Sequence, residues 1–224
     1  MADADALTGR RRRWLTLAFA LLALGSFAAL ASAMREAHTV QWDTAALHQA
    51  QQWRAAHPLV EAVMRELSSL GSTPVMTLFT IVAAACLCVA HRTGRAAAVV
   101  MAMTTGALAV TALKAGFGRA RPDPSFAALV QDGLSFPSGH ATMSAVFYLT
   151  AGALLAQRQV QRGMRAFLLG AAAFMTVMVG VTRVMLGVHW ASDVVAGWIF
   201  GAGWAALWFS IASHLRDARN ARRG

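Results

Sequence analysis

The chain has 224 residues, of which 57% are hydrophobic and only 13% are charged. Runs of about 20 apolar residues, each long enough to cross a bilayer core of about 30 Å, recur along the sequence, and a soluble protein of this size could not bury so much apolar surface. The composition therefore indicates a polytopic membrane protein. The formal net charge of +10 comes from basic residues beside these runs, which argues against a nucleic-acid partner and favours anionic membrane lipid.

The apolar runs predict an all-α bundle of six transmembrane helices. In chain order they cover residues 14–33, 74–90, 96–113, 141–156, 167–181 and 194–213. The first run follows four arginines and so resembles a signal peptide, with Ala31-Ser32-Ala33 as a weak cleavage site, but its length favours a retained helix. We expect one membrane-embedded domain over residues 1–224, with cytoplasmic tails at 1–13 and 214–224.

Arginines at the turns all fall on one side of a six-span arrangement. Besides the run at 10–13, they are Arg92, Arg95, Arg158, Arg162, Arg165, Arg216, Arg219, Arg222 and Arg223. Short loops rich in Lys and Arg stay in the cytoplasm, so both termini are predicted to be cytoplasmic in a protein of the cytoplasmic membrane. The remaining loops then face the cell exterior or, in a Gram-negative cell, the periplasm.

The segment 34–72, between the first two runs, is more polar. Pro58 suits the first position of a helix, and Gly71 suits its end. One stripe between them holds Leu59, Val63, Met64, Leu67 and Leu70. We expect an amphipathic helix lying on the outer face of the membrane. An additional role, covering a site or guiding a lipid into it, is the alternative for this segment.

Two cysteines, Cys86 and Cys88, lie two residues apart in the second run. On a helix they point in different directions, which indicates packing rather than a disulfide or a metal pair. No other spacing in the sequence is typical of a metal site. We therefore expect neither a metal nor another cofactor.

Pro137-Ser138-Gly139-His140 immediately precedes the fourth run. Proline and serine suit the start of a helix, and glycine allows another group to approach the backbone closely. The plain interpretation is an ordinary helix start. A helix N-terminus with exposed amides is also an anion site, in which case His140 would lie beside the anion, and phosphate is a natural ligand.

Arg183 ends the fifth run, and His189 and Asp193 are four residues apart at the start of the sixth, so that on a helix they share one face. One interpretation is an ion pair at a helix end. The other is that Asp193 holds the imidazole of His189 in one tautomer and leaves the second ring nitrogen free to attack an electrophile.

Basic residues also follow the third run, at Lys114, Arg119 and Arg121. Each alone is typical of a side chain that extends toward the lipid headgroups. Lys114 with Arg121-Pro122, then residues 137–140, and then Arg183, His189 and Asp193 together resemble the three-part signature of the type 2 phosphatidic acid phosphatases. These are integral-membrane lipid phosphate phosphatases related to vanadium-dependent haloperoxidases.

The signature spans residues 114–193, with one departure. Thr182 stands where the family usually has serine, so a hydroxyl is preserved. The resemblance implies that His189 attacks phosphorus to form a phosphohistidine, that Asp193 orients it, and that His140 protonates the leaving group and later activates water. It assigns phosphate binding to Lys114, Arg121, Ser138, the Gly139 amide and Arg183. No metal is implied, because fixed cations and N–H donors meet the needs of phosphoryl transfer.

The expected function is hydrolysis of a lipid phosphate or diphosphate at the outer leaflet. Apolar helix faces do not distinguish phosphatidic acid, undecaprenyl diphosphate, phosphatidylglycerol phosphate and the phosphates of lipid A. A lipid-to-lipid phosphotransferase and a non-catalytic headgroup binder or transporter are the alternatives. Two histidines, one of them backed by a carboxylate, favour an enzyme, because a binder needs only cations. The oligomeric state is left open.

Overall fold

The computed structural model describes residues 2–35 and 40–221, and within these ranges all regular secondary structure is helical, as predicted. The elements are α1 (Ala2–Arg35), α2 (Val40–Ala56), α3 (Pro58–Ser69), α4 (Thr73–Val89), α5 (Thr93–Phe117), the short 3-10 helix η1 (Pro124–Phe126), α6 (Gly139–Ala156), α7 (Arg162–Met185) and α8 (Ala191–Ala221). Helices α1 and α8 continue into the predicted tails.

Within the described residues, five helices are long and apolar enough to cross a membrane. They are the segments Trp14–Met34, Thr93–Phe117, Gly139–Ala156, Arg162–Met185 and Ala191–Leu215. A sixth span results if α3 and α4, which meet at a bend of 41°, are counted together. Because α4 covers the predicted second run, the predicted membrane bundle is confirmed with five to six candidate spans.

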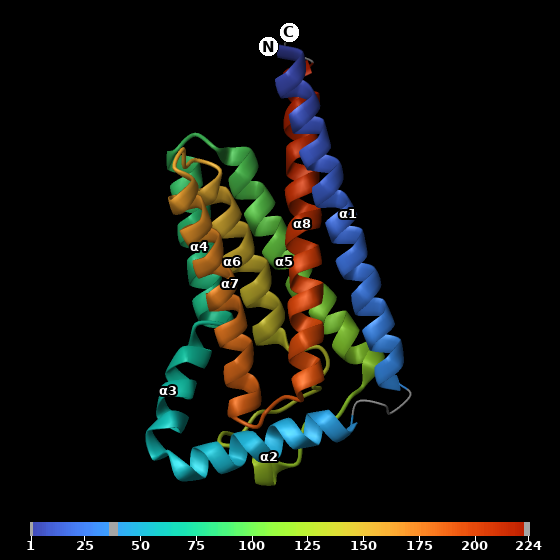
Figure 1. The fold of residues 1–224 in the computed structure, drawn as a ribbon, viewed down its shortest axis with the longest axis vertical. Helices are drawn as coiled ribbons and strands as arrows, with labels where there is room; N and C mark the ends of the chain where they lie inside the picture. Colours follow the sequence, from blue (N-terminus) through green and yellow to red (C-terminus); the bar gives the residue numbers. More distant parts are fainter. Residues whose placement is uncertain (1, 36–39, 222–224) are drawn as a thin grey trace.

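The long helices run side by side, and α2 lies across one end of the bundle (Figure 1). The two termini lie at the opposite end, together with the α4–α5 and α6–α7 turns that carry Arg92 and Arg158 (Figure 1). We call the end with α2 and the loop 118–138 the loop end. The arginine-rich turns and the loops that hold the signature are therefore on opposite ends of the molecule, as the predicted span count requires.

Helix α6 packs closely between α7 and α8 because small residues line these contacts. A Cβ added to Gly152 of α6 would lie 2.5 Å from the Cβ of Ala172 in α7. A Cβ added to Gly201 of α8 would lie 2.6 Å from the Cβ of Ala145 in α6. Such contacts bring membrane helices together by van der Waals packing. They fix the relative positions of the helix ends that carry the signature.

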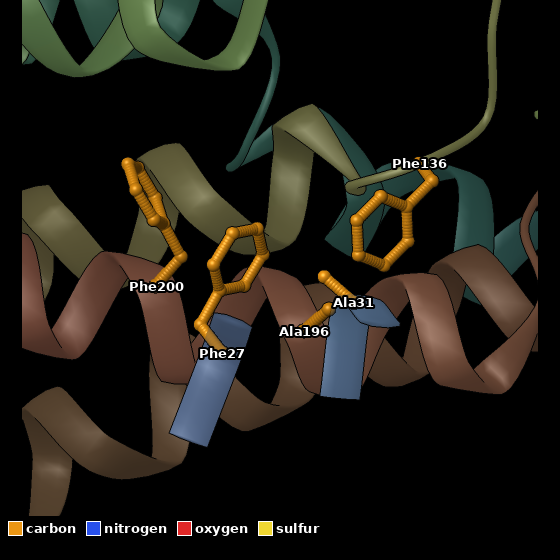
Figure 2. Packing of buried hydrophobic residues seen from close by; sticks show 5 residues of the cluster. All are labelled: Phe27, Ala31, Phe136, Ala196 and Phe200. Carbon is orange, nitrogen blue, oxygen red and sulfur yellow. The ribbon is translucent and has the colours of Figure 1, made fainter. Parts of the chain in front are cut away.

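An aromatic cluster anchors the loop 118–138 to the bundle. Phe136 of this loop is 1% exposed, and its ring stacks on Phe27 of α1 with 5.8 Å between centroids. Phe27 also contacts Phe200 of α8 at 5.1 Å, and Ala31 and Ala196 complete the cluster (Figure 2). Burial of an aromatic side chain stabilises its position by about 1.5–3 kcal/mol. The end of the loop that precedes α6 is therefore held in a fixed position against α1 and α8.

The polar segment between the first two spans forms two helices, and its residues 36–39 lie outside the described ranges. Helix α3 begins at Pro58 as predicted, whereas α2 was not predicted as a separate helix. The predicted apolar stripe is partly uncovered, since Leu59 is 81% and Val63 50% exposed, and the buried residue of α3 is Ser68. A membrane surface would cover such a stripe, so its position on the outer face stays a prediction.

Candidate active site

The three parts of the signature meet at the loop end. Five of the predicted site residues line a cavity of about 810 Å³ between α4, α5 and α6, namely Lys114, Arg121, Gly139, His140 and His189. The other three, Ser138, Arg183 and Asp193, do not line the cavity and are buried, with at most 3% of each side chain exposed. Residues up to 79 positions apart in sequence are thus brought together by the antiparallel spans.

The start of α6 has the form predicted from its sequence. Ser138 is the N-cap, and its Oγ accepts a hydrogen bond from the amide of Ala141 at 3.5 Å. Gly139 and His140 occupy the first turn, where backbone amides have no partner within the helix. The hydroxyl of Ser138 is therefore engaged in capping, and Gly139 and His140 are the residues of this turn that reach the cavity.

His189 is held by a different partner at each ring nitrogen. Nδ1 lies 3.3 Å from Oδ2 of Asp193 and 3.3 Å from Oγ of Ser135, whereas Nε2 lies 3.1 Å from Nη1 of Arg121. A guanidinium can only donate hydrogen bonds, so this contact requires a lone pair on Nε2 and places the ring proton on Nδ1. Nε2 is therefore the unprotonated ring nitrogen, and its lone pair accepts the hydrogen bond from Arg121.

The predicted helical face shared by His189 and Asp193 is wrong in detail. Helix α8 begins at Ala191, so His189 lies in the turn before it. The imidazole and the carboxylate still meet because this turn reverses tightly at Gly187, whose φ of 71° is in the left-handed region that favours glycine. The contact that the sequence predicted is present, although a turn forms it.

Burial dominates the titration of His189, whose side chain is 2% exposed. Desolvation lowers its pKa to about 4, and the hydrogen bond and charge of Asp193 oppose this shift only in part. The positive charges of Arg121 and Arg183 lower the pKa further. The imidazole is therefore neutral at neutral pH, which is the form that a nucleophile needs. Burial also lowers the pKa of Arg121.

Both oxygens of Asp193 are occupied. Oδ1 accepts from Nη1 of Arg119 at 2.6 Å. Oδ2 accepts from the amide of Trp190 at 3.1 Å and from the hydroxyl of Ser135. Neither Arg119 nor Ser135 was among the predicted site residues. Arg119 was interpreted as a headgroup contact, and nothing in the sequence around Ser135 distinguishes it from an ordinary loop serine.

The two cations at the cavity also hold the surrounding loops. Nζ of Lys114 donates to the carbonyl of Ser135 at 3.4 Å. Arg121 donates from Nε to the carbonyl of Gly133 (3.0 Å) and from Nη1 to the carbonyl of Val188 (2.7 Å). Both side chains are thus oriented before any ligand binds, and backbone oxygens offset part of their mutual repulsion.

Arg183 is oriented by two residues that the sequence did not indicate. Its Nη1 donates to Oγ of Ser68 in α3 at 2.6 Å, and its Nη2 donates to Oε1 of Gln131, which lines the cavity. Its Nε is buried and has no hydrogen-bond partner among the described residues. A buried donor without a partner is unfavourable, so this nitrogen is available to an additional acceptor.

A metal-binding arrangement is not found in the part of the chain that the structure describes, where no group of three or more His, Cys, Asp or Glu side chains is placed to hold an ion. Cys86 and Cys88 are free and exposed on α4. The expected independence from metals stays a prediction.

A comparison with known protein families shows the family to which the chain belongs. Residues 95–217, more than half of the sequence, match the PAP2 superfamily. The chain belongs to this superfamily of membrane phosphatases, which confirms the resemblance seen in the signature.

Two relatives and one solved structure show how far the similarity extends. Phosphatidylglycerophosphatase B of Bacillus subtilis is 30% identical over 146 residues, 64% of this chain and 71% of that protein. Lipid A 1-phosphatase of Rhizobium johnstonii is 38% identical over 116 residues, 48% of this chain but only 41% of that relative's length. The crystal structure of a transmembrane PAP2 type phosphatidylglycerolphosphate phosphatase from Bacillus subtilis superimposes with a TM-score of 0.79 at 25% identity, covering 86% of this chain and 94% of the other. The chain is therefore an integral multi-pass membrane protein.

Proposed function

We propose that this protein is a lipid phosphate phosphatase that hydrolyses a phosphomonoester or diphosphate of a membrane lipid through a phosphohistidine at His189. One observation carries the proposal. His189 lines a cavity that also holds Lys114 and Arg121, its unprotonated Nε2 accepts a hydrogen bond from Arg121, and its Nδ1 faces Asp193. A neutral histidine backed by a carboxylate and surrounded by cations is suited to attack an anionic phosphoryl group.

In the first step, Nη1 of Arg121 transfers its hydrogen bond from Nε2 of His189 to a phosphoryl oxygen. The released Nε2 lone pair then attacks phosphorus and forms the N–P bond while the bond from phosphorus to the leaving oxygen breaks. Asp193 stabilises the positive charge that develops on the ring. His140, on the same cavity, donates a proton to the departing alkoxide or phosphate. In the second step, His140 takes a proton from water, the water oxygen attacks phosphorus, and the N–P bond breaks to release inorganic phosphate.

The phosphoryl oxygens would be bound by Lys114, Arg121, the Gly139 amide and Arg183, with Ser138 holding the start of α6 in place. The unpartnered Nε of Arg183 and the free amides at the start of α6 support this assignment. These fixed donors neutralise the charge that a metal ion would otherwise offset. We therefore expect full activity in excess EDTA, and reversible loss in EDTA would contradict the proposal.

The cavity supports a lipid as the substrate. From the signature it extends between α4 and α5 along an apolar lining that includes Met76, Ile81, Val100 and Leu108. Ile81 and Leu108 are 60% and 65% exposed, so the lining continues onto the surface of the span region. An apolar tail could lie there while the phosphate occupies the cationic end.

The membrane orientation is also proposed. The arginine-rich turns lie at the end opposite the signature (Figure 1), and the preference of such turns for the cytoplasm supports an active site on the outer face of the cytoplasmic membrane. Membrane lipids are the expected partners, and nucleic acid is not.

Phosphate release from a lipid panel tests the function. The purified protein in detergent would be assayed against phosphatidic acid, phosphatidylglycerol phosphate, undecaprenyl diphosphate and lipid A, since the named relatives act on two of these classes. His189→Ala should lower the rate by about 10³-fold or more. Retention of a tenth of the activity would contradict the assignment, and transfer of label from lipid to lipid instead of water would indicate a phosphotransferase.

A further inference from the structure

Asp43 is a buried carboxylate that the signature does not include. It lies in the first turn of α2, and its side chain is completely buried. Oδ1 accepts a hydrogen bond from the amide of Ser192 (2.8 Å), and Oδ2 accepts from the Ser192 hydroxyl (2.5 Å) and from Nη2 of Arg119 (2.7 Å). A carboxylate is costly to bury unless it is paired, and these contacts supply the pairing.

Arg119 connects Asp43 to the carboxylate that faces the histidine. Its Nη1 lies 2.6 Å from Oδ1 of Asp193 and 2.8 Å from Oγ of Ser192, and its guanidinium lies 5.3 Å from the ring centre of Trp190. One guanidinium therefore bridges two buried carboxylates, one through each terminal nitrogen. We refer to Asp43, Arg119 and Asp193 as the two-carboxylate cluster.

The charge of this cluster matters for His189. Two carboxylates and one guanidinium leave one net negative charge beside the imidazole. If Arg119 paired with Asp193 alone, the pair would be neutral, and its attraction for positive charge on the ring would be much weaker. Asp43 binds the other terminal nitrogen of Arg119 and so balances its charge.

We propose that Asp43 is a positioning residue for phosphoryl transfer. It holds Arg119 against Asp193 and balances the positive charge of Arg119, so that the two-carboxylate cluster keeps one net negative charge beside His189. This inference rests on the proposed phosphohistidine reaction. A purely structural role, in which Asp43 only fastens α2 to the start of α8, uses the same hydrogen bonds but does not require a charge.

Asp43→Asn removes the charge and keeps the size of the side chain and an acceptor for the Ser192 amide, but its Nδ2 cannot accept from Arg119 or from the Ser192 hydroxyl. The split between kcat and KM and the double variant Asp43→Asn/Arg119→Gln therefore separate the two roles. We expect kcat on a lipid phosphate to fall about 10- to 100-fold with KM changed less than about threefold, because the lost stabilisation belongs to the transition state. The melting temperature in detergent is expected to fall under either role, because two hydrogen bonds to the buried Oδ2 are lost. Glu66→Gln, which removes a carboxylate at an exposed position of α3, is the matched control and should keep kcat. A kcat for Asp43→Asn above half of the wild-type value would overturn the proposal.

For the double variant Asp43→Asn/Arg119→Gln, the charge-balancing role and the anchor role predict opposite changes in kcat. It removes one negative and one positive charge, and Asp193 is still held by Ser135 and Trp190. Its kcat should exceed that of Asp43→Asn by at least about fivefold, whereas a simple anchor predicts a further loss, which would overturn the proposal. If Asp43→Asn does not accumulate in the membrane, the double variant decides alone: a tenth or more of wild-type kcat supports the proposal, and less overturns it.

Failure of this inference can be distinguished from failure of the proposed function. If the wild-type protein releases no phosphate from any lipid and forms no phosphohistidine, the proposed function itself fails. If the wild type is active and His189→Ala is inactive, but Asp43→Asn is unimpaired, only the role of Asp43 fails.

Discussion

Arg183 of α7 donates a hydrogen bond to Ser68 of α3, with 2.6 Å between Nη1 and Oγ. The serine is the buried residue of a helix whose apolar side chains are exposed or half-buried. A helix outside the main bundle therefore orients an arginine that is proposed to bind the phosphoryl group.

Ser68→Ala should weaken phosphate binding. The change leaves Nη1 of Arg183 without this acceptor, and loss of a hydrogen bond to a charged group costs about 1.5–3 kcal/mol, or roughly 10- to 160-fold in kcat/KM. Steady-state kinetics in detergent would measure the loss. Ser69→Ala is the matched control, because Ser69 is exposed and its hydroxyl donates to the carbonyl of Glu66 within the same helix. Equal effects of the two changes would contradict the role of Ser68.

The ring of His189 should stay neutral well below pH 6.5. Its pKa is lowered to about 4 in the folded protein, chiefly by burial, whereas an ordinary histidine titrates near 6.5. The unfolded chain therefore binds the proton first, and stability falls as the pH drops from about 6.5 toward 4. Ring ¹⁵N NMR at pH 5.5, with His189→Ala used to assign the signal, should give a neutral ring protonated at Nδ1. An imidazolium signal at that pH would refute the prediction.

His140→Ala should affect substrates according to their leaving group. An aryl phosphate has a good leaving group and needs little protonation, whereas an alkyl lipid phosphate depends on a proton donor. We expect a loss of about 10²- to 10⁴-fold on the alkyl substrate and at least about tenfold less on the aryl substrate. Equal losses on both would mean that His140 only binds phosphate.

The turn that carries His189 should not tolerate a side chain at Gly187. A Cβ there would lie 1.9 Å from the carbonyl oxygen of Phe126, and φ is 71°. Gly118 has a similar φ of 61° but open space around it, so Gly118→Ala isolates the backbone strain. That strain costs about 1–2 kcal/mol, or about 2–8 °C in melting temperature. Gly187→Ala should lower the melting temperature further and reduce activity, and equal shifts for both variants would argue against the steric contact.

Thiol labelling should establish the orientation in the membrane. In a background of Cys86→Ala and Cys88→Ala, a cysteine at Asp132 should react with a membrane-impermeant reagent in intact spheroplasts. A cysteine at Gln159 should react only after the membrane is opened, because this turn is predicted to be cytoplasmic. Both positions are exposed, so access within the protein is not limiting. The reverse pattern would move the site and its substrate pool to the inner leaflet.

The spans and the starts of α3 and α6 could be predicted from the sequence because their signals are local. An apolar run of sufficient length marks a span, and Ser138 before Gly139 marks the start of α6. Because consecutive spans alternate in direction, the span count alone placed Lys114, His140 and His189 at one end.

The residues that hold the signature in place could not be predicted in this way. Asp43 lies 76 residues from Arg119 and 149 from Ser192, and a single aspartate in a polar segment does not indicate either partner. Ser68 and Gln131 contact Arg183 from 115 and 52 residues away. Only the packing of α2, α3 and the loop 118–138 across the bundle creates these contacts.

The continuity of the cavity with the exposed residues Ile81 and Leu108 affects how substrate reaches the histidine. A lipid that entered along this path would never leave the bilayer, so its supply would depend on how many such lipids occupy each unit of membrane area rather than each litre of solution. The dephosphorylated product would diffuse away sideways in two dimensions, while the released phosphate would leave into water. Separate exits of this kind would keep the two products from recombining at the site.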